Sequence, residues 1–156
     1  MRTLTILAAL TIGIFTIGRQ QTATAAPQDV ASTVDALRAA TVAGEIDAIV
    51  GFYGTDAAVV SPFGTFTGPD QIRAFYTGFL AMNPGLSVTF VDRTVSLSTE
   101  VHHSLVTSES IRAAGVSRIR LTETIVVVDG TIRSAAVLLD LTDPETVRFA
   151  AALAGG

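Results

Sequence analysis

The spacing of apolar residues changes along the chain at Asn83-Pro84-Gly85, and this change constrains the fold more than any other feature. Before it, apolar side chains recur every three or four residues, which is typical of helices with one buried side. After it, they recur at about every second residue, which is typical of strands. Helices followed by strands indicate an α+β fold in which the helices cover one face of an antiparallel sheet.

The first part of the chain predicts three helices. Helical spacing of apolar residues predicts one helix over residues 29–43, ended by Gly44, and a second over residues 45–53. Pro69 suits the first turn of a third helix, because its missing N–H would have no partner there. The predicted buried side of this third helix carries Ile72, Phe75, Tyr76 and Phe79.

The rest of the domain predicts mainly strands. Residues 56–60 predict a short strand, and Asp129-Gly130 is typical of a tight hairpin turn. A short helix is expected over residues 144–153. Long strands are expected at residues 86–97, 100–112, 116–128 and 131–141. The predicted fold is therefore a curved antiparallel sheet of about four long strands wrapped around three N-terminal helices.

The first 25 residues have the pattern of a secretory signal peptide. Arg2 gives a positive start, residues 3–18 are uncharged and mostly apolar, and Ala23-Thr24-Ala25 offers small residues at the cleavage site. We expect cleavage after Ala25 and a secreted or periplasmic protein. An uncleaved membrane anchor is the alternative, although a membrane span needs about 20 apolar residues and this run has 16.

Residues 26–156 have the length of one domain and a marked acidic charge. They contain 8 arginines against 14 acidic residues, a net charge of −6, and no lysine. An acidic surface without a basic cluster argues against nucleic acid and anionic membranes as partners of the processed protein. The chain has no cysteine, so its core and not disulfides must hold the fold together.

Three segments carry a resemblance to a known family. Residues 61–76 read SPFGTFTGPDQIRAFY, residues 44–50 read GEIDAIV, and residues 53–60 read YGTDAAVV. They resemble the ketosteroid isomerases, in which a catalytic Asp stands before Pro-Phe-Gly or Pro-Val-Gly and a helix with an Ile-x-x-Phe-Tyr pattern follows. The domain is identified on this pattern as a member of the nuclear transport factor 2-like superfamily, on the branch of ketosteroid isomerases and SnoaL-like polyketide cyclases.

The resemblance implies a cone whose open end holds a mostly apolar ligand pocket. It does not imply the isomerase reaction, because the family's catalytic Asp falls on Ser61 and its oxyanion tyrosine falls on Leu37. The tyrosine of the Phe-Tyr pair is kept as Tyr76, and the family's protonated Asp falls on Glu123. Because a hydroxyl alone cannot act as the base, steroid isomerisation in its familiar form is not expected.

Glu123 is the main candidate for an acid in the pocket. It shares one face of its strand with Leu121 and Ile125, whereas Thr122 and Thr124 lie on the other face. A carboxyl group among apolar side chains loses hydration, which favours the neutral form that can donate a hydrogen bond. The alternative is a carboxylate paired with a buried arginine or placed at the wet rim of the sheet.

The two histidines of the chain are adjacent, so alternation puts them on opposite faces of one strand. His103 shares a face with Val101 and Leu105, which makes it the candidate base, since a neutral imidazole accepts a proton near pH 7. His102 falls on the other face. The alternative for His103 is a place on the surface or at a sheet edge. Without a third histidine or any cysteine, no metal site is expected.

These residues support two classes of function. The first is an exported acid–base enzyme that isomerises, cyclises or dehydrates a small apolar molecule, with Glu123 and His103 as catalytic residues and no cofactor. The second is a non-catalytic module that binds an apolar ligand or forms a homodimer through the outer face of the sheet. In both, the expected pocket wall comprises Tyr53, Ser61, Phe63, Tyr76, Leu105, Val137 and Leu139.

The signal peptide gives the first testable prediction. When the full chain is expressed in a bacterium that exports it, the protein should leave the cytoplasm and begin at or near Ala26. N-terminal sequencing of the exported material measures this. Replacing both Ala23 and Ala25 with leucine should block cleavage, and an intact Met1 on exported wild-type protein would contradict the prediction.

Overall fold

The structure is a computed structural model that describes residues 27–154. The predicted signal peptide, residues 1–25, lies outside the described residues. Within them the order of elements is α1 (Pro27–Ala43), α2 (Ile46–Gly51), β1 (Tyr53–Ser61), β2 (Gly64–Thr67), α3 (Gly68–Met82), β3 (Ser87–Ser96), β4 (Thr99–Thr107), α4 (Glu109–Ala113), β5 (Ile119–Val128), β6 (Thr131–Leu139) and α5 (Pro144–Ala154).

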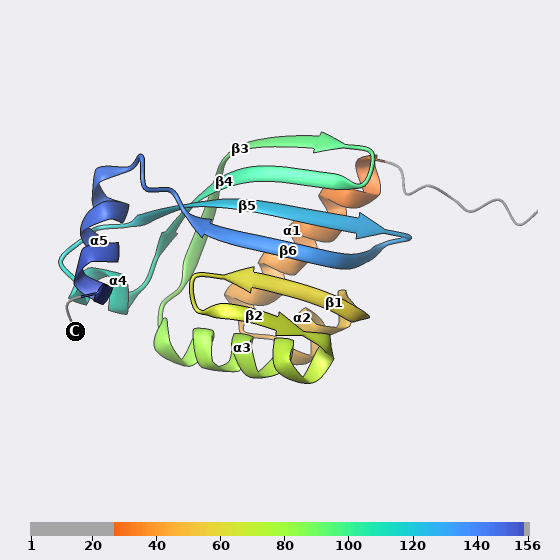
Figure 1. Ribbon diagram of the computed structural model, residues 1–156, viewed down its shortest axis with the longest axis horizontal. Helices are drawn as coiled ribbons and strands as arrows, with labels where there is room; N and C mark the ends of the chain where they lie inside the picture. Colours follow the sequence, from red (N-terminus) through yellow and green to blue (C-terminus); the bar gives the residue numbers. More distant parts are fainter. Residues whose placement is uncertain (1–26, 155–156) are drawn as a thin grey trace, which may run out of the picture.

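The strands form one curved sheet in the order β2-β1-β6-β5-β4-β3 (Figure 1). Neighbouring strands are antiparallel except β1 and β6, which are parallel. Register shifts lie between Phe90 and Asp92 of β3 and between Val126 and Val127 of β5. Irregularities of this kind bend a strand and increase its twist, so they contribute to the curvature of the sheet. The predicted α+β fold with a curved sheet is confirmed.

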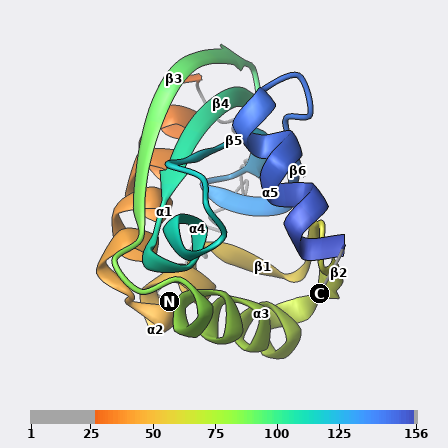
Figure 2. The ribbon, with the colours of Figure 1, turned by 90° about the vertical axis from the view of Figure 1, so that its left-hand side faces the viewer.

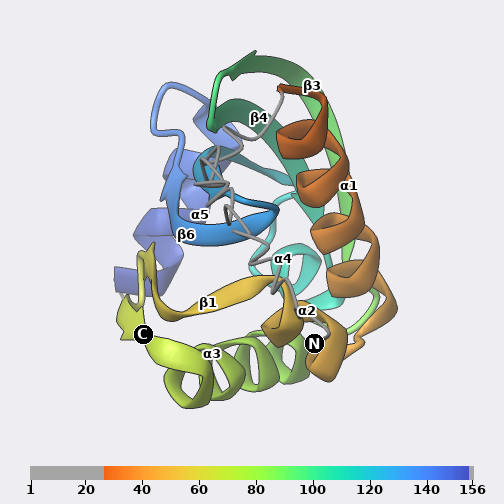
Figure 3. The same cartoon turned by 90° about the vertical axis from the view of Figure 1, so that its right-hand side faces the viewer.

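The longer helices α1 and α3 lie against the concave side of the sheet. Figures 2 and 3 show α1 running beside β3 and β4, and α3 crossing beneath β1. The C-terminal helix α5 packs near β5 at one end of the sheet. None of the helices between residues 27 and 154 is long and apolar enough to cross a membrane.

The predicted second helix was too long, and the sheet contains more strands than expected. Tyr53 was assigned to that helix, but it begins β1 and pairs with Ile132 of β6. The strand β2 was not predicted. It has four residues, Gly64–Thr67, and folds back on the end of β1 directly after the turn at Pro62-Phe63. Parallel pairing between β1 and β6 joins distant parts of the chain, so no local spacing reveals it.

The predicted strand over residues 100–112 ends at Thr107, because a short helix begins there. Ser108 is the N-cap of α4, and its Oγ accepts a hydrogen bond of 3.2 Å from the backbone N–H of Ile111. The same hydroxyl donates to Oδ1 of Asn83 at 2.9 Å. Ser108 followed by Glu109 is a helix-start pattern, and it overrides the alternation of apolar residues that predicted a strand.

The core consists of two clusters of buried apolar side chains. The larger cluster joins α1, α2, α3 and the concave face of the sheet, and Ile49, Ile72 and Ile132 in it are completely buried. The smaller cluster lies where β4, α4 and β5 meet, with Phe149 of α5 packed against it. The two clusters leave space between them, and the candidate site occupies that space.

The hydroxyl groups of Tyr53 and Tyr76 form a buried hydrogen bond of 2.7 Å, which ties β1 to α3. Burial, together with the neighbouring Tyr76, raises the pKa of Tyr53 well above its usual value. Burial also raises the pKa of Tyr76. The chain has 2 tyrosines, so both belong to this pair.

This pair predicts how the protein responds to alkaline pH. In the unfolded chain both tyrosines lose their protons at about pH 10, whereas the folded state keeps them. Stability should therefore be unaffected by this pair below about pH 10 and should fall as the pH rises further. Ultraviolet titration should show no tyrosinate in the folded protein near pH 10. The urea-unfolded protein is the control, and a folded-state midpoint at about pH 10 would contradict the prediction.

Candidate functional site

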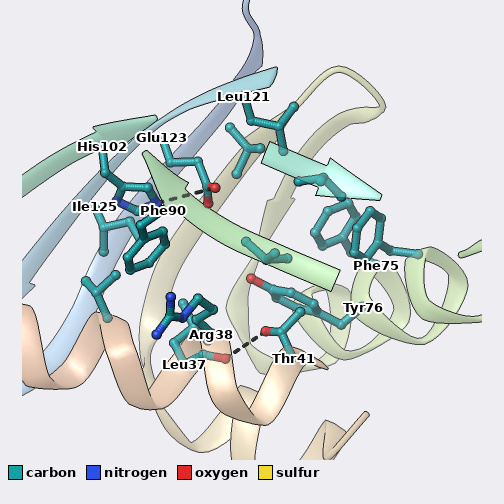
Figure 4. Close-up of a pocket in the computed structure, with 15 residues that line it drawn as sticks. Leu37, Arg38, Thr41, Phe75, Tyr76, Phe90, His102, Leu121, Glu123 and Ile125 are labelled. Carbon is teal, nitrogen blue, oxygen red and sulfur yellow. Dashed lines mark hydrogen bonds and ion pairs between the residues drawn. The ribbon is translucent and has the colours of Figure 1, made fainter. Parts of the chain in front are cut away.

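A cavity of about 100 Å³ lies between α1, α3 and the concave face of the sheet (Figure 4). Most of its wall is hydrocarbon, and its polar side chains are Arg38, Thr41, Tyr76, His102 and Glu123. The remaining lining residues of this first cavity are Val34, Leu37, Phe75, Phe79, Val88, Phe90, Val106, Leu121, Ile125 and Val137. A mostly apolar cavity with a few converging polar groups is the usual form of a small-molecule site.

A second cavity of about 80 Å³ lies on the α5 side of the first. Ser61, Pro62 and Phe63 form part of its wall, and Phe149 and Leu153 of α5 form another part. The two cavities share the side chains of Phe75, Phe79, Val106, Leu121 and Val137. They are therefore neighbouring chambers separated by apolar side chains.

Glu123 brings a carboxyl group into the first cavity from the middle of β5. It stands opposite His102 of β4 in the antiparallel register, so both side chains share the concave face. Oε1 of Glu123 accepts a hydrogen bond of 2.6 Å from Oγ of Ser104 and lies 3.3 Å from Nε2 of His102. The Glu123 side chain keeps 18% of its surface exposed, so it can meet a molecule in the cavity.

His102 is held between two carboxyl groups inside the protein. Its Nδ1 lies 3.0 Å from Oε1 of Glu100, and both side chains are almost completely buried. Neither nitrogen is aligned for a hydrogen bond, although both lie within ion-pair distance of a carboxyl oxygen. These contacts are therefore electrostatic. The ring of Phe90 covers the imidazole, with 4.3 Å between ring centres.

Arg93 extends this polar cluster toward the surface. Its Nε donates to Oε1 of Glu100 at 3.1 Å, and its two terminal nitrogens donate to the two oxygens of Asp35 at 3.1 Å and 3.0 Å. These hydrogen bonds lower the pKa of Asp35 and raise that of Arg93. A continuous series of charged and polar groups thus runs from α1 through β3 and β4 to Glu123.

The expectation that His103 and Leu105 face the pocket is wrong. His103 lies on the outer face of β4, and its Nδ1 is 2.7 Å from Oδ1 of Asp92. This hydrogen bond lowers the pKa of Asp92. The concave face of β4 carries instead the polar residues Glu100, His102 and Ser104, which are buried because they contact one another, Arg93 and Glu123.

The other expected pocket residues divide between the two cavities. Tyr76 lines the first cavity, Val137 lines both, and Ser61, Phe63 and Leu139 line the second. Tyr53 lines neither, because it lies behind Tyr76 with its hydroxyl hydrogen-bonded to it. Oγ of Ser61 accepts a hydrogen bond of 3.1 Å from the backbone N–H of Phe63, so this hydroxyl stabilises the turn between β1 and β2.

Arg38 and His102 are site residues that the sequence analysis missed. Arg38 follows Val34 by four residues and precedes Thr41 by three, which is the helical spacing that places all three on the cavity side of α1. This spacing in the sequence could therefore have identified Arg38 as a cavity residue. His102 had no such signal, because its face is occupied by polar residues. Within residues 27–154, no group of three His, Asp or Glu side chains could hold a metal ion.

Comparison with known proteins gives a family match and several similar folds. The family model of the SnoaL-like domain matches residues 34–135. No curated protein matches the sequence. A candidate polyketide cyclase from Sinorhizobium meliloti has a similar structure, with 17% identity, a TM-score of 0.62 and coverage of 72% of this chain and 99% of that chain.

Two further structures have a similar fold at low sequence identity. A candidate ketosteroid isomerase from Kribbella flavida has 11% identity and a TM-score of 0.57, covering 72% of this chain and 78% of its own. A de novo designed protein with a curved β-sheet has 14% identity and a TM-score of 0.63, covering 83% of this chain and 98% of its own. At these identities the similarity establishes the fold and not the reaction.

The cluster around Glu100 predicts a large effect of Arg93→Met on stability. The variant removes the charge that compensates a fully buried carboxylate, and breaking a buried pair in this way typically costs about 3–5 kcal/mol. Urea unfolding measures the loss. The control is Arg73→Met, because Arg73 pairs with Asp47 on the surface and such pairs contribute about 1 kcal/mol or less. Equal losses in the two variants would contradict the prediction.

Proposed function

Because the chain belongs to the SnoaL-like domain family, we propose that it binds a small apolar molecule with a carbonyl or hydroxyl oxygen in the first cavity and moves a proton on that molecule. The reaction class is an acid–base isomerisation, cyclisation or dehydration. One observation carries the proposal: the carboxyl group of Glu123 opens into a cavity that is otherwise mostly hydrocarbon, with His102 3.3 Å away.

Glu123 has the geometry of a group that meets the ligand. Its Oε1 is engaged by Ser104 and His102, whereas its Oε2 accepts no hydrogen bond from the described residues. In the neutral form, Glu123 donates a hydrogen bond to a ligand oxygen. In the ionised form, it accepts a proton from a carbon next to a carbonyl. The mostly apolar wall lowers the local dielectric constant, which strengthens either interaction.

His102 takes the place that the sequence analysis gave to His103. Glu123 can return the proton that it accepts to another atom of the ligand, so this carboxyl group can act as base and acid in turn. Nε2 of His102, 3.3 Å from its Oε1, supports this role electrostatically. Glu100 is a positioning residue in this arrangement. It contacts Nδ1 of His102 and favours the ring orientation in which Nε2 faces Glu123.

The binding module remains the second candidate function, and specific residues favour it. Ser61 stands where the ketosteroid isomerases have their base, and its hydroxyl is hydrogen-bonded within the turn. Leu37 stands where they have a tyrosine, and it adds hydrocarbon to the wall of the first cavity. Both replacements preserve an apolar pocket while removing polar groups from it.

The proposal extends to location and assembly. The N-terminal pattern of Arg2, an apolar run and Ala23-Thr24-Ala25 supports export, so the ligand would be met outside the cytoplasm. The outer face of the sheet carries the exposed side chains of Val91, Val101 and Leu138. Exposed apolar side chains on this face support a homodimer through it.

The test uses cyclohex-3-en-1-one, which is small, apolar and carries a carbonyl. Proton transfer converts it to the conjugated cyclohex-2-en-1-one, whose ultraviolet absorbance is easily followed. Glu123→Gln should still bind this ketone but should lower turnover about 10²- to 10⁴-fold. Glu123→Leu should also weaken binding about tenfold, because it removes the hydrogen bond.

The control is His103→Gln, because His103 lies on the outer face of β4 and its replacement should change neither binding nor turnover. If the wild-type protein binds the ketone without converting it faster than Glu123→Gln does, the binding module is the correct function. If the wild-type protein and Glu123→Leu bind it equally weakly, the first cavity is not the ligand site.

A further inference from the structure

Arg38 is a cation in the apolar wall of the first cavity, and the proposed proton transfer does not use it. Among the described residues that line the two cavities, it is the only arginine. It projects from α1, whereas Glu123 projects from β5 on the opposite side of the cavity (Figure 4). The cavity therefore has a positive group at one side and an acidic group at the other.

The guanidinium of Arg38 is held in place by an aromatic ring. Its Cζ lies 4.2 Å from the centre of the Phe90 ring, which is within the range of a cation–π interaction. Phe90 is itself fixed, because it also contacts His102 and the guanidinium of Arg93. The charge of Arg38 is thus oriented before any ligand arrives.

The hydrogen-bond donors of Arg38 are not used by the protein. Its nearest carboxylate is Asp35, at 3.6 Å, which is longer than a hydrogen bond. Both oxygens of Asp35 are engaged by Arg93 at 3.0 Å and 3.1 Å. No described residue accepts a hydrogen bond from Arg38. A guanidinium with free donors matches the two oxygens of a carboxylate.

We propose that the ligand is a small apolar monocarboxylic acid whose carboxylate binds Arg38 and whose hydrocarbon part fills the first cavity and carries the carbonyl or hydroxyl oxygen that meets Glu123. This inference rests on the proposed function, which makes the first cavity the ligand site, and it names the chemical class of the ligand. The opposite orientation would leave Arg38 facing hydrocarbon and would bring the carboxylate of the ligand to Glu123, whose ionised form would repel it. Arg38 and Glu123 together therefore set the direction of binding.

The volume of the cavities limits the length of the acid. A dry cavity of about 150 Å³ is enough to bind benzene, and the first cavity holds about 100 Å³. The second cavity adds about 80 Å³ behind the shared side chains of Phe75 and Phe79. The two chambers lie side by side, so an acid with a chain of about eight carbons probes both of them.

The experiment compares octanoate with octan-1-ol by isothermal titration calorimetry at pH 7. The wild-type protein should bind octanoate about tenfold to a hundredfold more tightly than the alcohol, because a charge-assisted hydrogen bond is lost with the alcohol. Arg38→Met should remove this preference, and Arg38→Lys should keep part of it. Circular dichroism confirms that each variant is folded.

The matched control is Arg148→Met. Arg148 also pairs with an acid three residues away, at 3.7 Å, but it lies on α5 and lines neither cavity. The control changes the net charge equally and should keep the preference for octanoate. Equal affinity of the wild-type protein for acid and alcohol would overturn the inference while leaving the ketone test of the proposed function intact. Loss of the preference in both variants, or no binding of octanoate, would also overturn it.

Discussion

The buried carboxylate of Glu100 is the constraint on which the rest of the site depends. A charge with no access to water must be compensated, and Arg93 compensates it at 3.0 Å, while Nδ1 of His102 lies at the same distance from the same oxygen. Arg93 then binds Asp35, which joins β3 and β4 to α1. His102 in turn lies next to Glu123. One buried acid therefore links the packing of the first helix to the position of the polar group in the cavity.

The remainder of the cavity follows from the shape of the sheet. Its curvature keeps α1 and α3 from filling the whole concave face, and the apolar side chains between them leave two neighbouring chambers. Polar groups enter the first chamber from α1, α3, β4 and β5, so ligand contacts come from elements far apart in the chain. A scaffold of this kind tolerates changes in its polar residues without loss of the fold.

Much of the architecture could be predicted because it depends on local signals. Helical spacing gave α1, Pro69 marked the first turn of α3, and Asp129-Gly130 gave the turn between β5 and β6, where both residues have positive φ. The side of β5 that carries Glu123 followed from its apolar neighbours and agrees with its place in the cavity. The catalytic role of Glu123 stays a prediction.

The sequence by itself determined the fold class, the family and the inward face of β5, because repeated apolar residues and the motif at residues 61–76 are properties of neighbouring positions. Only the tertiary structure decided that β1 pairs with β6 and that His102, not His103, faces the cavity. The physical reason is the same in both cases. The partners of buried polar atoms often come from distant parts of the chain. Glu100, His102 and Ser104 are buried on the concave face of β4, where Arg93 of β3 and Glu123 of β5 contact them.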